Sequence, residues 1–120
     1  MSREADTPYG RVTITDEVIA TIAGAAATEC YGIVGMASRK IKDGIAELLG
    51  RENLSRGVEI NDDGQKVDVR LYIIVGYGTK IREVAHNAAE QVKYVLQSTT
   101  GLAAPNVSIV VQGVKVRDGR

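Results

Sequence analysis

Two stretches of the chain place apolar residues at the spacing of an amphipathic helix. The first, 15–31, begins at Thr15 or Asp16, whose side chains can accept hydrogen bonds from the free amides of a helix N-terminus, and ends before Gly32. The second, 79–98, is longer, and its apolar stripe consists of Ile81, Val84, Ala85, Ala88, Val92, Val95 and Leu96. We expect both helices to pack on the core through these faces.

Short apolar runs predict strands at 10–14, 33–37, 58–60, 66–75 and 107–111. The run 66–75 alternates as a half-buried strand does, with Val67, Val69, Leu71 and Ile73 inward and Asp68, Arg70 and Tyr72 outward. Asn61-Asp62-Asp63-Gly64 separates this run from the preceding one and predicts a β-hairpin.

Residues 38–56 predict a third, shorter helix. Ile41, Ile45, Leu48 and Leu49 stand at i, i+4, i+7 and i+8, and the pattern stops near Gly50. The segment holds five bases and three acids. Its apolar face can therefore either cover the core or serve a partner or a membrane surface. On the second alternative, Ile41 and Ile45 are candidate partner-binding residues.

The predicted order of elements is β-α-β-(α)-β-β-α-β, which indicates an α+β fold. Helices laid on one face of a mixed β-sheet form two layers around one core. We expect a single domain over 9–116, preceded by a polar leader over 1–8 and followed by a polar tail over 117–120.

Composition narrows the possible roles. Fifteen acids balance fifteen bases, so the surface as a whole has no electrostatic reason to bind nucleic acid or anionic lipid. The chain has a single Cys and therefore cannot form an intrachain disulfide. The absence of disulfides is typical of proteins that function in the reducing cytoplasm. The longest aliphatic run, 73–75, is far too short to cross a bilayer. We expect a cytoplasmic protein that does not insert directly into a membrane.

Reactive side chains are scarce. His86 falls on the polar side of the second helix, beside Glu83 and Glu90, whereas Cys30 falls on the apolar side of the first. The two are therefore not expected to form a Cys–His nucleophilic pair. Gly76-Tyr77-Gly78 resembles half of a dinucleotide fingerprint but lacks its third glycine. We expect no enzymatic activity, no cofactor and no metal.

Three further residues have two interpretations each. Glu29 lies seven residues after Ile22, on nearly the same face of the first helix. Its carboxylate can extend past the helix end to solvent or to a nearby Arg, or it can serve as a polar anchor for another chain. Tyr72 and Ile74 are expected on the outer face of the sheet, where they are open to a partner. The small residues around Gly24 permit close approach by another element or by a partner.

The ordered set of these segments resembles the alkaline shock and general stress protein family of Gram-positive bacteria. The matching segments are GRVTI at 10–14, IAGAAATECYGIVGM at 22–36, DVRLYIIVGYG at 68–78 and VSIVVQGV at 107–114, together with 81–91. DGIAELLG at 43–50 is similar to a compact subtype without long charged tails.

The resemblance implies a cytoplasmic protein linked to envelope and alkaline stress and, in some members, to lipid metabolism. It implies no catalytic or cofactor residues. Some members are held at the membrane by an integral-membrane partner. We therefore predict a non-enzymatic interaction module that binds a protein partner or a second copy of itself. The alternative is a nucleic-acid-binding regulatory domain, against which the neutral charge and the lack of an aromatic platform count.

Overall fold

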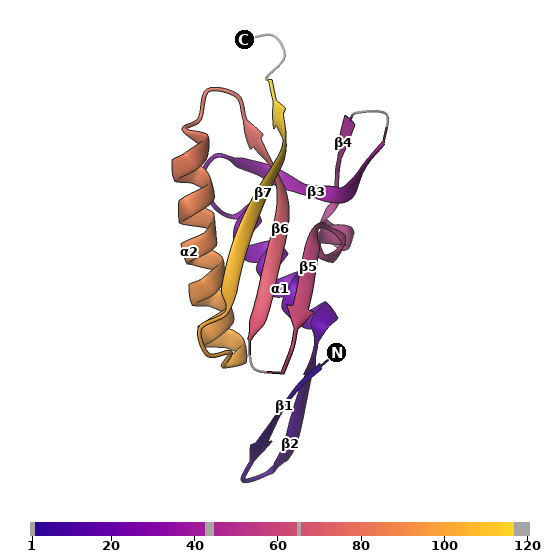
Figure 1. The fold of residues 1–120 in the computed structure, drawn as a ribbon, viewed down its shortest axis with the longest axis vertical. Coiled ribbons are helices and arrows are strands. Elements are labelled where there is room, and N and C mark those ends of the chain that lie inside the picture. Colours follow the sequence, from indigo (N-terminus) through magenta and orange to yellow (C-terminus); the bar gives the residue numbers. More distant parts are fainter. Residues whose placement is uncertain (1, 43–44, 65, 117–120) are drawn as a thin grey trace.

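The computed structural model describes residues 2–42, 45–64 and 66–116. These form an α+β fold, in which a mixed β-sheet is packed against helices (Figure 1). The elements are β1 (Ser2–Thr7), β2 (Gly10–Thr15), α1 (Asp16–Thr28), β3 (Ile33–Lys42), β4 (Ile45–Leu48), the 3-10 helix η1 (Arg51–Gly57), β5 (Val58–Asp62), β6 (Val67–Gly76), α2 (Ile81–Thr100) and β7 (Asn106–Lys115).

Strand β6 organises the main sheet. Strands β3 and β5 pair with it antiparallel, β7 pairs with it parallel, and β4 extends the sheet by pairing with β3. The parallel pairing of β6 with β7 is possible because α2 supplies the crossover between them. Helix α2 contacts both α1 and β7, and Figure 1 shows α1 behind the strands of the sheet.

The core is aliphatic and follows the predicted periodicities. The inward positions of β6 are buried, namely Val67, Val69, Leu71, Ile73 and Val75. Helix α1 contributes Ile19, Ala23 and Ala27, and α2 contributes Val84, Ala88, Val92 and Leu96. The predicted hairpin is also confirmed, because β5 and β6 pair in register from Val58 opposite Leu71 to Asp62 opposite Val67.

Both long helices are confirmed, with small shifts at their ends. The Thr15 hydroxyl caps α1 by accepting a hydrogen bond from the Val18 amide at 3.4 Å. Gly101, at φ +77°, ends α2 in the left-handed conformation that glycine adopts easily. Ile81 was expected in the buried stripe of α2 but is 41% exposed, because the helix begins at this residue, at the edge of the packed region.

The helix predicted within 38–56 is wrong. Strand β3 continues to Lys42, and β4 returns beside it, with Lys42 opposite Ile45 and Ile41 opposite Ala46. An i, i+4 spacing suits a helix, but it also suits two strand residues on either side of a tight turn. Asp43-Gly44, between the two strands in the sequence, is a dipeptide that favours such turns. The side chains of Ile41 and Ile45 lie outside the described part of the chain.

The expected polar leader contains a strand. Residues 2–7 form β1, which pairs with β2 along its whole length as a two-stranded ribbon. The ribbon projects from the rest of the molecule (Figure 1), and the longest dimension of the molecule is 57 Å. The segment has no apolar alternation of its own. Its conformation follows from backbone pairing with β2. The expected tail, 117–120, lies outside the described residues.

Candidate partner-binding groove

A groove of about 590 Å³ lies between α1, the β3–β4 pair and η1. Its lining includes Ala25 of α1, Val34 and Gly35 of β3, Leu48 of β4 and Leu54 of η1. Val34 is 43% exposed and Leu48 is 45% exposed. The groove therefore presents branched aliphatic side chains to solvent instead of burying them in the core.

Two glycines permit this arrangement. A Cβ atom on Gly24 would lie 3.2 Å from the Leu54 Cβ, so the glycine lets η1 approach α1 closely. A Cβ atom on Gly35 would lie 2.8 Å from the Leu48 Cδ1, so Leu48 rests across the backbone of β3. Gly24 thus serves close packing within the chain, and Gly35 lets the Leu48 side chain lie over β3.

Glu29 and Arg51 provide charges of opposite sign on the groove. Both side chains are exposed. Neither forms an ion pair or a hydrogen bond with any other residue in the described ranges. Glu29 is the C-cap of α1, and it reaches solvent as the first of its two interpretations requires. It also lines a second pocket of about 300 Å³, together with Tyr31 and Asn87.

Cys30 is next to Glu29 but has the properties of a structural thiol. Burial, and then the negative charge of Glu29, raise the pKa of the Cys30 thiol above its ordinary value of 9.0. The thiol donates to the Ala26 carbonyl at 3.6 Å. A raised pKa disfavours the thiolate, which is the nucleophilic form. His86 is exposed on α2, as expected.

Tyr72 and Ile74 of β6 were both expected to be exposed on the outer face of the sheet, and the structure differs from this expectation at Ile74. Tyr72 is half-buried, and its hydroxyl donates to the Glu59 carboxylate at 3.2 Å. Ile74 was expected to be open to a partner, but it is only 7% exposed. Strand β3 pairs with one edge of β6, and β7 pairs with the opposite edge of β6. The Ser38 carbonyl of β3 nevertheless accepts a hydrogen bond from the Gln112 side chain of β7 at 3.2 Å. The strand therefore crosses β6 near Ile74.

Among the predicted site residues whose side chains the structure describes, Glu29 lines the groove. Tyr72 and Ile74 do not line the groove, although Ile74 is paired with Gly35, which does. Val34, Leu48 and Arg51 were not predicted as site residues. Leu48 was placed on a helix, and nothing in the local pattern indicated that β3 and β4 would pair beside α1. The Asp-Gly dipeptide at 43–44, which favours hairpin turns, is the one local signal that could have suggested a hairpin in place of the helix.

Comparison with known proteins places the chain in a family. Residues 4–116 match the model of the alkaline shock protein 23 family, which has a cell envelope-related function. The chain belongs to this family. Its relatives include the uncharacterized protein YloU of Bacillus subtilis (strain 168), 56% identical over 97% of this chain and 98% of the relative. An uncharacterized protein of Streptococcus pyogenes serotype M6 is 42% identical over 97% of each chain.

A more distant relative, the uncharacterized protein YqhY of Bacillus subtilis (strain 168), is 35% identical over 92% of this chain and 81% of its own. Among solved structures, a MamM CTD variant aligns with 85% of this chain and 98% of its own at 14% identity. Its TM-score of 0.47 is too low to support a structural argument. Within the described ranges, none of α1, η1 and α2 combines the length and the hydropathy that a membrane span requires.

Proposed function

We propose that this protein is a non-enzymatic interaction module of cell-envelope homeostasis, and that it binds a protein partner through the groove between α1, β3–β4 and η1. The observation that carries the proposal is the pair of half-exposed aliphatic residues, Val34 and Leu48. They are flanked by the charges of Glu29 and Arg51, which form no ion pair with a residue in the described part of the chain. An apolar centre with a charged rim is the usual composition of a protein-binding surface.

The charges of the rim suit recognition more than monomer stability. Exposed charges that pair with nothing inside the chain contribute little to folding. They can, however, steer a partner and fix its orientation when it carries the opposite charges in matching positions. Glu29 and Arg51 thus support a binding site with a preferred direction along the groove.

The outer face of the sheet supports nucleic-acid binding poorly. A pocket of about 310 Å³ on this face is lined by Glu59, Asp68, Arg70 and Asn106, among others. Arg70 forms an ion pair with Glu59 at 3.6 Å, and Asn106 donates to Asp68 at 3.0 Å. Two acids against one base give this surface a charge that repels phosphates, whereas nucleic-acid binding depends on neutralising them.

Association with the envelope would follow from this protein contact. The partner we propose is an integral-membrane protein with a segment that extends from the membrane and occupies the groove. Such an arrangement requires no lipid-binding surface on the chain itself, and it is compatible with a net charge of zero.

The test is affinity capture from a native lysate with membranes retained, using the wild-type protein, Glu29→Lys and Arg51→Glu. Both substitutions are on exposed side chains, so folding should be unaffected. Glu90→Lys, which reverses an exposed carboxylate on α2, is the matched control. We expect one membrane protein to be retained by the wild type and by Glu90→Lys and lost from both groove variants. Equal capture by all four proteins would contradict a role for the groove.

A further inference from the structure

Strand β7 lies at an edge of the main sheet. Among the strands of the described ranges it pairs with β6 alone, from Asn106 to Lys115, with one irregularity in the register. Residues 106–114 include no charged side chain. A long edge strand without charges offers a row of backbone groups with which another strand can pair, and proteins usually protect such an edge. The first charge on β7 is Lys115, at its C-terminal end.

The backbone at this end of β7 directs hydrogen-bonding groups away from β6. The Tyr77 amide donates to the Lys115 carbonyl at 2.9 Å, so this carbonyl points toward the β6 side. The C=O and N–H of one planar trans peptide unit point in opposite directions, and the Val116 amide therefore points outward. The backbone groups of Val114 also point outward, because successive residues of a strand direct these groups to opposite edges. Within the described ranges, neither valine has a backbone hydrogen bond outside the β6–β7 pairing.

The same two valines leave an aliphatic surface uncovered. Val114 is 45% exposed, although Val75, its partner on β6, is fully buried. Val116 is 62% exposed and stands two residues further on, which is the spacing of one face of a strand. A strand added beside β7 would cover both side chains with alternate residues of its own. Burial of this surface favours aliphatic residues at those positions of the added strand.

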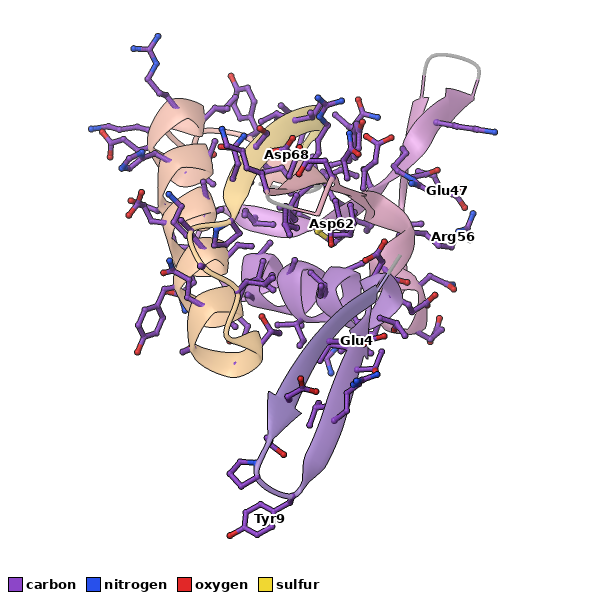
Figure 2. All side chains as sticks on the ribbon, turned by 60° about the horizontal axis from the view of Figure 1, so that its bottom comes forward. Glu4, Tyr9, Glu47, Arg56, Asp62 and Asp68 are labelled. Carbon is purple, nitrogen blue, oxygen red and sulfur yellow. The ribbon has the colours of Figure 1, made fainter. Side chains whose placement is uncertain are left out.

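Lys115 determines the charge that suits an added strand. Its side chain is exposed, and it forms no ion pair with a residue in the described part of the chain. The one acid of β6, Asp68 (Figure 2), is paired with Asn106, at the other end of β7. On adjacent strands, a carboxylate directly opposite a lysine is stabilising, whereas a second lysine there is destabilising. The position opposite Lys115 therefore favours an acid.

We propose that an extended segment of another protein adds to β7 as a further strand, with an aliphatic–acidic–aliphatic sequence opposite Val114, Lys115 and Val116. In this mode of peptide recognition, backbone hydrogen bonds provide affinity and alternate side chains provide specificity. Antiparallel pairing of two copies of this chain about Lys115 would place two lysines opposite each other, which disfavours a second copy as the occupant. None of the three residues lines the groove, so this inference does not rest on the proposed function.

A synthetic peptide tests the inference with the purified full chain. The probe is a fluorescein-labelled peptide of sequence Ser-Thr-Val-Glu-Val-Thr-Ser, and the control peptide has Lys in place of Glu. Fluorescence anisotropy measures the dissociation constant. We expect the wild type to bind the Glu peptide saturably, with a dissociation constant below about 1 mM, and about fivefold more tightly than the Lys peptide. Absence of saturable binding in this range would overturn the proposal.

Charge reversal at Lys115 should exchange the peptide preference. We expect Lys115→Glu to bind the Lys peptide about fivefold more tightly than the Glu peptide. Lys66→Glu reverses an exposed lysine just before the opposite end of β6, and this matched control should keep the wild-type preference. The groove variant Arg51→Glu should keep it as well. If Lys115→Glu still prefers the Glu peptide, the proposed pairing is wrong.

Methylation of the peptide backbone distinguishes strand addition from contact through side chains alone. A strand that joins β7 uses the amides of one of its edges, and successive amides point to opposite edges. We compare a Glu peptide N-methylated at Glu with one N-methylated at the next Val. We expect one methylation to abolish binding and the other to preserve it. Equal effects of the two would overturn the added-strand geometry.

Sedimentation velocity of the wild type, with and without excess Glu peptide, tests whether a second copy occupies the edge instead. We expect the peptide to leave the assembly state of the protein unchanged, because copies of the chain do not pair through β7. Assemblies that the Glu peptide dissociates, and the Lys peptide does not, would identify a second copy as the occupant and overturn the proposal.

Discussion

Gly32 and Val84 hold the turn after α1 against the first turn of α2. Gly32 has a φ of +89°, and a Cβ atom there would lie 2.6 Å from the Val84 Cγ2. The close approach therefore requires glycine, both for its conformation and for space. Val84 is buried between these elements. His86, two residues further along α2, is exposed. The two positions provide a test of which face of the helix is packed.

We expect Val84→Asp to lower the free energy of unfolding by several kcal/mol, because it buries a carboxylate without a partner. His86→Ala, on the exposed face, should change the free energy by less than about 0.5 kcal/mol. Urea denaturation of the two variants and the wild type measures both effects. An unchanged denaturation midpoint for Val84→Asp would contradict the packing described above.

At the scale of elements, the η1 segment fixes β5 and the β3–β4 pair in place. Gly57 ends η1 where the chain passes β3, and a Cβ atom there would lie 2.6 Å from the Ala37 carbonyl oxygen and 3.2 Å from the Met36 Cβ. A carbonyl oxygen belongs to the backbone, so it can move only if β3 moves. Gly50, just before η1, differs: the nearest atom to a Cβ atom there is the Oε1 of the flexible Glu52 side chain.

We expect Gly57→Ala to destabilise the fold by about 1–3 kcal/mol, the usual cost of inserting atoms into a packed interior. Gly50→Ala is the matched control. It should be neutral or slightly stabilising, since Gly50 has a φ of −76°, which alanine adopts without strain, and alanine restricts the unfolded chain. Thermal unfolding of both variants provides the comparison. Equal melting temperatures would show that η1 does not pack on β3 as described.

At the scale of the whole molecule, the net charge determines how strongly the protein is attracted to an anionic lipid surface. Fifteen acids and fifteen bases give no net attraction to an anionic surface. A basic residue near such a surface contributes about 1 kcal/mol, and in 38–56 three acids offset five bases. This balance favours the proposed contact with the envelope through a protein partner over direct binding to lipid.

We expect the purified protein to stay in the supernatant when it is sedimented with anionic vesicles at physiological salt, because its net charge of zero gives no overall attraction to the vesicles. A polybasic peptide serves as the positive control. Strong co-sedimentation of the protein without any partner would contradict this expectation, and 38–56 would then be the first segment to mutate.

The sequence indicated correctly those features that depend on residues close together in the chain. The alternation along β6 identified its inward side chains, and the helical spacing from Val84 to Leu96 identified the packed face of α2. The β5–β6 turn followed from Asn61 to Gly64. Each of these patterns has one interpretation, because a single element must bury one continuous face and its period is fixed by backbone geometry.

Tertiary structure decided the features that depend on residues far apart in the sequence. The spacing of Ile41 and Ile45 suits both a helix and a hairpin, and only pairing with β3 selects the hairpin. Ile74 is on the outward side of β6 by alternation, yet β3 crosses β6 near it. Glu29 became part of a groove because β4 and η1 lie beside α1. Local periodicity indicates which face of an element must be buried, whereas the packing of the whole chain determines which other element covers that face.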